Sequence, residues 1–209
     1  MPTSPGVFIA FEGGEGAGKS TQEQLLAEHL TAAGHEVVRT REPGGTPAAE
    51  AMRNIVLSPE FIGLDARSEA LLFAASRGEH VARVIRPALA RGAVVVCDRY
   101  LDSSVAYQGY GRDLGVERVR DLSLWATNNL LPDLTIVLDI DPVIGLTRIT
   151  NPDRLEAEPI EYHARVRAAF LDIAKGDPDR YLVIDAVLPI HEIAKEIHER
   201  ADLLMAVPR

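Results

Sequence analysis

The chain lacks most features that mark a secreted, membrane-bound or nucleic-acid-coating protein. It has one cysteine, Cys97, so no internal disulfide can form, and a reducing cytoplasm is the expected location. No apolar run is long enough to span a membrane, and no basic segment with an apolar core opens the chain, so neither a membrane span nor a signal peptide is expected. Its 22 basic residues are outnumbered by 31 acidic ones, which argues against nonspecific binding to nucleic acid or anionic membranes.

One segment near the start combines glycines with a lysine. Gly13–Ser20, which we call the phosphate loop, reads GGEGAGKS and matches the pattern G-x-x-x-x-G-K-[ST]. An apolar run at 7–11 predicts a buried strand before it, and 21–33 predicts a helix after it. Backbone N–H groups and the helix N-terminus then converge on a point that suits a triphosphate. Lys19 would reach the β- and γ-phosphates, and the Ser20 hydroxyl would ligate Mg²⁺. The alternative is a turn that only joins a strand to a helix.

Strands and helices are expected to alternate along the whole chain, whose 209 residues suit one domain better than two. Strands are expected at 7–11, 37–40, 93–97, 134–139 and 181–185. Helices are expected at 21–33, 48–57, from Asp65 or Ser68 to about Leu89, at 117–129, from Pro142, at 160–174 and at 190–205. This alternation predicts an α/β fold, a parallel sheet with helices on both faces. Ligands bind such sheets at the carboxyl ends of the strands.

Phosphoryl transfer requires positive charge and a metal-holding carboxylate near the phosphates. Asp98 closes an expected central strand, where it would lie on the metal side; the alternatives are a helix cap or an ion pair with Arg99. Arg99 can fork onto phosphate oxygens. Arg53 and Arg77, taken alone, would be ordinary surface arginines.

Two further sets of residues have both a functional and a structural interpretation. The segment 148–154 has two arginines around a helix break, which suits either a mobile lid over a nucleotide or a polar loop. Phe73, Tyr107 and Tyr110 are candidate platforms for stacking a base, although Phe73 lies in an apolar helix stripe, where core packing is the default.

Several further runs, together with the phosphate loop, resemble the bacterial thymidylate kinases. These runs are Phe11–Gly13 (FEG), Arg41–Thr46 (REPGGT), Leu72–Arg77 (LFAASR), Asp98–Tyr100 (DRY) and Ser103–Gly109 (SSVAYQG). The resemblance extends from about Val7 to the last helix. Many families share the phosphate loop, but the order and spacing of the REPGGT, DRY and SSVAYQG runs are far more specific.

The resemblance implies a P-loop NTPase-type three-layer fold. It suggests a single nucleoside-monophosphate-kinase-like domain over residues 1–209, with a short lid at about 148–160. The implied reaction moves the γ-phosphoryl group of ATP to dTMP with Mg²⁺, giving dTDP for dTTP synthesis. Members of this family are typically homodimers formed through helix packing.

The resemblance also assigns site residues. For ATP they are Gly13, Gly14, Glu15, Gly16, Ala17, Gly18, Lys19, Ser20 and Thr21. For dTMP they are Glu42, Arg53, Phe73, Arg77, Arg99, Ser103, Tyr107 and Gln108. Ser20 and Asp98 would hold the metal, and the catalytic candidates are Lys19, Glu15, Arg148 and Arg154.

Individual roles follow from the same resemblance. Arg53 and Arg99 would clamp the dTMP phosphate, and Glu15 would lie near the acceptor sugar. Phe73 would stack on thymine, with Arg77 and Gln108 on its edge, since stacking holds any base while polar groups at the edge select one. Tyr107 is a weaker candidate for sensing that a 2′-hydroxyl is absent.

The chain departs from the family pattern in three places. Ser76 stands where the family usually has Asp. The lid is short, contains a proline and has few basic residues. Gly16 occupies the loop position where some members carry a catalytic arginine, so Arg148 or Arg154 would have to supply it. Arg154 is preferred, because its D-R-L-E run matches the family.

Two other functions are alternatives to this one. A kinase for a different monophosphate or for a nucleoside would share most of these features. A nucleotide switch such as a GTPase is disfavoured, because the chain has no N-K-x-D run to read guanine and no Asp followed three residues later by Gly.

Overall fold

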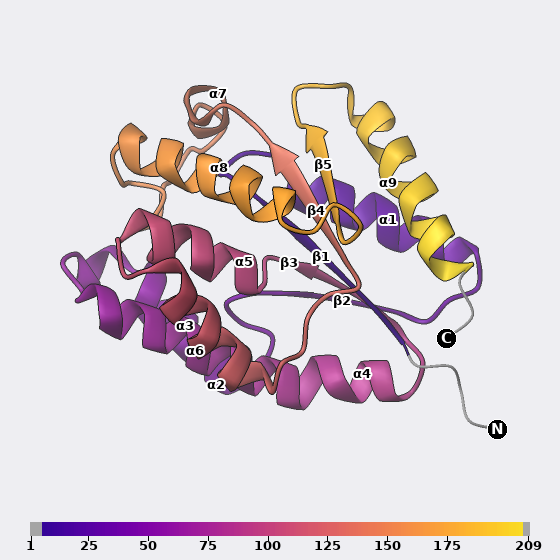
Figure 1. Cartoon of the computed structure of the whole chain (residues 1–209), viewed down its shortest axis with the longest axis horizontal. Coiled ribbons are helices and arrows are strands. Elements are labelled where there is room, and N and C mark those ends of the chain that lie inside the picture. Colours follow the sequence, from indigo (N-terminus) through magenta and orange to yellow (C-terminus); the bar gives the residue numbers. More distant parts are fainter. Residues whose placement is uncertain (1–5, 207–209) are drawn as a thin grey trace.

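A computed structural model describes residues 6–206 and places one parallel sheet at the centre, in the strand order β2-β3-β1-β4-β5 (Figure 1). The strands are β1 (Val7–Gly13), β2 (Val37–Arg41), β3 (Val94–Asp98), β4 (Leu134–Asp139) and β5 (Tyr181–Asp185). All five strands were expected from the sequence. Because β1 is central, its carboxyl end places the phosphate loop in the middle of one sheet edge. Asp98 of β3 pairs with Phe11 on one side and Arg41 on the other, so the three strand ends meet there.

Helices cover both faces of this sheet (Figure 1). They are α1 (Lys19–Ala32), α2 (Pro47–Leu57), α3 (Ala66–His80), α4 (Arg86–Ala90), α5 (Leu101–Ser104), α6 (Val116–Thr127), α7 (Pro142–Leu146), α8 (Ile160–Lys175) and α9 (Ile190–Met205). Side chains alternate along a strand, so Ile9 and Phe11 pack against α1 and α9 while Phe8 and Ala10 face the opposite helices. Burial on both faces explains the uninterrupted apolar runs of β1, β3 and β4. The three-layer α/β fold is therefore confirmed.

Helix starts follow their local signals. The Thr46 hydroxyl accepts a hydrogen bond from Ala49 N at 3.1 Å, and Pro47 opens α2. The Asp65 carboxylate accepts from the backbone N–H groups of Arg67 and Ser68, which makes Asp65 the cap of α3. No helix within residues 6–206 is long and apolar enough to cross a membrane.

The segment after β3 is helical, although no helix was expected there from the sequence. Helix α5 continues into a π-helical segment over Val105–Gly111. Glycines are poor helix formers, so Gly109 and Gly111 concealed it. Gly111 is needed for close packing, since a Cβ there would lie 2.6 Å from the Tyr162 ring, and a Cβ on Gly109 would come within 3.3 Å of Val116 Cα. This segment positions Tyr107 and Gln108, in keeping with the frequent use of π-helical turns at functional sites.

Candidate active site

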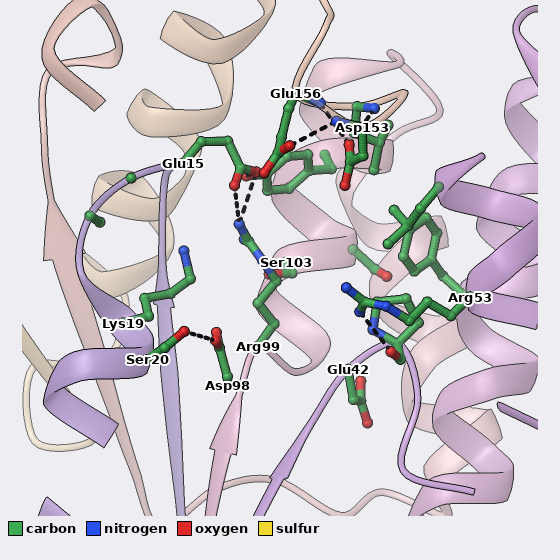
Figure 2. A pocket seen from close by; sticks show the side chains of 18 of the residues that line it. Glu15, Lys19, Ser20, Glu42, Arg53, Asp98, Arg99, Ser103, Asp153 and Glu156 are labelled. Atoms are coloured by element: carbon green, nitrogen blue, oxygen red, sulfur yellow. Dashed lines mark hydrogen bonds and ion pairs between the residues drawn. The ribbon is translucent and has the colours of Figure 1, made fainter. Parts of the chain in front are cut away.

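A cavity of about 460 Å³ opens at the carboxyl ends of the strands, between the phosphate loop and helices α2 and α3. This volume is in the usual range for a small-molecule site. The predicted site residues that line it are Glu15, Gly16, Ala17, Gly18, Lys19, Ser20, Thr21, Glu42, Arg53, Phe73, Asp98, Arg99, Ser103, Tyr107 and Gln108. Figure 2 shows Lys19, Ser20 and Asp98 on one side, Arg53 and Glu42 on the other, and Arg99 between them.

The phosphate loop wraps around its own lysine. Gly18 has a left-handed backbone (φ 88°) and leads directly into α1, so the helix N-terminus faces the cavity. Lys19 Nζ donates to the carbonyls of Gly13 at 3.1 Å and Gly14 at 2.8 Å. Burial lowers the pKa of Lys19, and the nearby Arg99 adds to this effect. Two carbonyls at the start of the loop thus hold the ammonium beside the cavity, where phosphate oxygens would pair with its charge.

Ser20 and Asp98 form the expected metal side of the cavity (Figure 2). Ser20 Oγ donates to Asp98 Oδ2 at 3.2 Å, and the buried Asp98 Oδ1 has no hydrogen-bond partner. Hydroxyl and carboxylate oxygens are ligands that Mg²⁺ prefers, and this ion is commonly held by one or two side chains together with phosphates. Within residues 6–206 no cluster of three or more His, Cys, Asp or Glu side chains could hold a metal alone. The donors present therefore fit a phosphate-bound Mg²⁺.

Glu15, Arg99 and Tyr107 form an ion-paired group at the middle of the cavity. Arg99 Nη2 contacts both carboxylate oxygens of Glu15 at 2.8 Å, and the Tyr107 hydroxyl donates to Oε1 at 2.5 Å. Burial alone would raise the pKa of Glu15, but Arg99, Lys19 and the Tyr107 hydroxyl outweigh it and lower the pKa to about 2. Both partners are thus charged and aligned before any ligand binds.

Glu12, which was not predicted to take part in the site, holds the backbone beneath this group. It is fully buried on β1 and accepts from the backbone N–H groups of Tyr100 and Ser103 at 2.9 and 3.0 Å. The Ser103 hydroxyl donates to it at 2.5 Å. Burial, reinforced by the nearby Asp102, raises the pKa of Glu12 to about 7. A lone carboxylate within an apolar strand was the sequence signal that could have revealed it.

The far end of the cavity carries one arginine, one aromatic ring and one amide. Arg53 Nη1 donates to the Pro43 carbonyl at 2.9 Å, which directs its guanidinium across the cavity (Figure 2). Phe73, with 8% of its surface exposed, and Gln108 line the wall. Glu42 belongs to this end as well, and the buried His80, another residue missed from sequence, contacts it at 3.0 Å through Nδ1.

Arg77 differs from its expected position at a base edge. It is 2% exposed and does not line the cavity. Its Nε donates to Glu42 at 2.7 Å, and its Nη atoms donate to Ser123, Ser104 and the Tyr100 carbonyl at 3.0 to 3.1 Å. Arg77 therefore braces the loop that carries Glu42 and does not face the cavity.

The two candidate arginines of the segment 148–154 lie in different places. Arg154, the preferred catalytic candidate, is buried away from the phosphate loop: its Nη2 donates to Glu69 at 2.6 Å and its Nε to the Val56 carbonyl at 2.8 Å. Arg148 is exposed, and its Nη1 donates to the Gly16 carbonyl at 2.8 Å. Of the two candidates, Arg148 is therefore the one that contacts the phosphate loop in this structure, and Arg154, the preferred one, does not.

Two departures from the family pattern have different outcomes. Gly16 has a left-handed backbone (φ 67°), and a Cβ there would lie 2.2 Å from the Gly145 carbonyl oxygen of α7. Position 16 therefore has no room for an arginine. Ser76 is buried and its hydroxyl has no hydrogen-bond partner, and nothing in the structure accounts for this residue.

Comparisons with known proteins agree with this geometry. A family model described as thymidylate kinase matches residues 11–197. A thymidylate kinase of Clavibacter sepedonicus is 56% identical over 205 residues, covering 96% of this chain and 97% of the relative. That of Leifsonia xyli subsp. xyli is 56% identical over 207 residues, covering 97% and 98%. The crystal structure of the Ehrlichia chaffeensis thymidylate kinase matches with a TM-score of 0.79 at 38% identity, covering 95% of this chain and 99% of that one. By its sequence and its fold, the chain belongs to the thymidylate kinase family.

Proposed function

We propose that the cavity binds ATP at residues 13–21 and dTMP at the opposite end, beside Arg53, Phe73 and Gln108. As a member of its family the chain phosphorylates dTMP to dTDP with ATP, a step of dTTP synthesis. The assignment of ATP and dTMP to opposite ends rests on one observation. The phosphate loop lines one side of the cavity, and Arg53, Phe73 and Gln108 line the other. This arrangement supports direct transfer between two bound nucleotides.

The charged side chains suggest a division of roles. Lys19 would neutralise the ATP phosphates. Arg53 and Arg99 would clamp the dTMP phosphate, and Arg99 would replace part of its contact with the Glu15 carboxylate by a contact with that phosphate. Glu15 and Tyr107 would then lie beside the acceptor sugar. Arg148 is our candidate for the cation that stabilises charge on the transferred phosphoryl group, since its guanidinium already contacts the phosphate loop at the Gly16 carbonyl.

Mg²⁺ would be held on the Ser20 and Asp98 side, where it would neutralise charge on the phosphate oxygens. Replacing Asp98 by asparagine is expected to raise the Mg²⁺ concentration for half-maximal activity by about tenfold or more, because changes around a bound metal typically cost that much affinity. Titration of activity with Mg²⁺ measures this. The control is Asp139→Asn at the end of β4, where the carboxylate pairs with Arg167. An equal shift in both variants would contradict the assignment.

The domain organisation, cellular location and oligomeric state are proposals as well. We infer one kinase domain with a short lid at about residues 148–160, acting in the cytoplasm as a homodimer. Leu71 of α3 and Trp125 of α6, which are 56% and 82% exposed on two helices that pack together, support an interface there. Sedimentation analysis of the protein in solution tests the dimer.

The acceptor assignment is tested by measuring ADP release with each nucleoside monophosphate. Strong stimulation by dTMP, lost when Arg53 is replaced by alanine, is expected, because Arg53 is the arginine that crosses the far end of the cavity. Faster turnover of another monophosphate, or full dTMP turnover without Arg53, would refute the placement of dTMP.

A further inference from the structure

Glu69 of α3 connects three separate parts of the acceptor end. Its side chain is fully buried, one helical turn before Phe73. Gln108 Nε2 donates to its Oε1 at 2.9 Å. Arg154 Nη2 donates to its Oε2 at 2.6 Å, and Arg112 contacts both oxygens at 3.2 and 3.3 Å. One carboxylate therefore holds an amide of the cavity wall and two arginines, of which Arg154 belongs to the lid segment.

This arrangement determines which atom of Gln108 is left for a ligand. A carboxylate paired with two guanidinium groups only accepts hydrogen bonds, so it must face the amide nitrogen and not the amide oxygen. Gln108 lines the cavity, and its oxygen is the polar atom that Glu69 does not use. The edge of thymine presents an N3–H donor between two carbonyls, whereas cytosine presents an acceptor at N3. An amide oxygen fixed at this place favours the first base and repels the second.

We propose that Glu69 is a positioning residue that presets the Gln108 amide, and thereby the base selectivity, of this kinase. The inference rests on the proposed placement of the base beside Gln108. The two arginines have a part in it, because Arg154 and Arg112 Nη2 both donate to Oε2, whereas Oε1 accepts its shorter hydrogen bond from Gln108 and only a longer one, at 3.3 Å, from Arg112 Nε. All of these hydrogen bonds exist in the ligand-free protein, so the selectivity is built in before dTMP arrives.

Glu69→Gln tests the proposal through base preference. In this variant Arg154 and Arg112 Nη2 retain an oxygen of residue 69 at the Oε2 position. The new NH₂ group then takes the place of Oε1, gives up the longer contact with Arg112 Nε, faces Gln108 and favours turning that amide around. We expect the ratio of kcat/KM for dTMP over dCMP to fall about 10- to 100-fold, the cost of one wrongly matched buried hydrogen bond, with the KM for ATP unchanged. Equal loss for both substrates would mean that Glu69 is merely structural, and would overturn the proposal.

The control is Glu158→Gln. Glu158 pairs with Arg112 at 2.6 Å but makes no contact with Gln108, so its replacement perturbs the same arginine without changing the amide. We expect the dTMP to dCMP ratio to stay at the wild-type value in this variant. A fall equal to that of Glu69→Gln would assign the effect to the arginines and overturn the proposal.

A second measurement needs no change at Glu69. Side-chain hydrogen exchange, followed by NMR in the ligand-free wild-type enzyme, should be much slower for Gln108 than for Gln24. Gln24 makes a hydrogen bond of the same kind to Glu28, also at 2.9 Å, but on the exposed surface. Equal exchange rates would refute a preset amide. Because no substrate is involved, this result is independent of the dTMP assignment, which fails separately if the wild-type enzyme prefers another monophosphate.

Discussion

Replacing Arg148 by alanine is expected to lower kcat about a hundredfold or more while the KM for dTMP changes little. The Arg148 guanidinium contacts the phosphate loop at the Gly16 carbonyl, and position 16 itself has no room for an arginine. A cation that acts on charge developing in the transition state affects kcat, and removal of one such group typically costs a hundred- to a thousandfold. Steady-state kinetics with both substrates measure it.

Arg154→Ala is the matched comparison. Its guanidinium lies on Glu69 and the Val56 carbonyl, so its loss leaves part of a buried carboxylate uncompensated. We expect a lower Tm together with a kcat reduced far less than in the Arg148 variant. A large loss of kcat at unchanged Tm, with Arg148→Ala near wild type, would return the catalytic role to Arg154.

The fold was predictable from the sequence because its signals are local. Apolar runs such as that of β4, the capping residues Thr46 and Asp65, and Pro142 at the start of α7 each act within a few residues of themselves. The phosphate loop is local in the same sense, since its glycines, its lysine and the following helix are contiguous. When all residues of a pattern are adjacent in the sequence, the pattern alone predicts the local backbone structure.

The positions of the arginines were not predictable, because their partners are remote in sequence. Arg154 was favoured for its D-R-L-E run, but in the structure the other residues of that run hydrogen-bond to one another. The Asp153 carboxylate accepts from the N–H groups of Leu155 and Glu156, and the Glu156 carboxylate accepts from Asp153 N. The run thus forms a capped turn, whereas the direction of the arginine is set by Glu69, which belongs to the distant helix α3.

Helical spacing could have revealed part of this arrangement. Glu69 and Phe73 are four residues apart and share one helix face, and Arg77 and His80 continue it at spacings of four and three residues. A buried face that carries a glutamate, an arginine and a histidine must pair them with one another or with other elements. The sequence shows that such partners exist, but only the packing of α3 against the neighbouring segments identifies them.

Placing an arginine on the phosphate loop itself, by Gly16→Arg, is expected to destroy activity and not to supply a catalytic cation. The change forces a side chain onto a left-handed backbone and brings its Cβ to 2.2 Å from the Gly145 carbonyl, which is backbone and cannot rotate away. Either the loop or α7 must shift by an ångström or more. Displacement of that size at a catalytic group costs about a hundredfold or more in kcat/KM.

Three companion variants isolate the cause. Gly16→Ala should lose nearly as much activity as Gly16→Arg, because the collision begins at Cβ. Gly14→Ala should fold with a Tm near wild type, since a Cβ there meets only the Ile140 side chain at 3.8 Å. In the Arg148→Ala background, Gly16→Arg should restore nothing. Recovery of kcat in that double variant would show that the loop can carry its own arginine despite the close approach of Gly145 to Gly16.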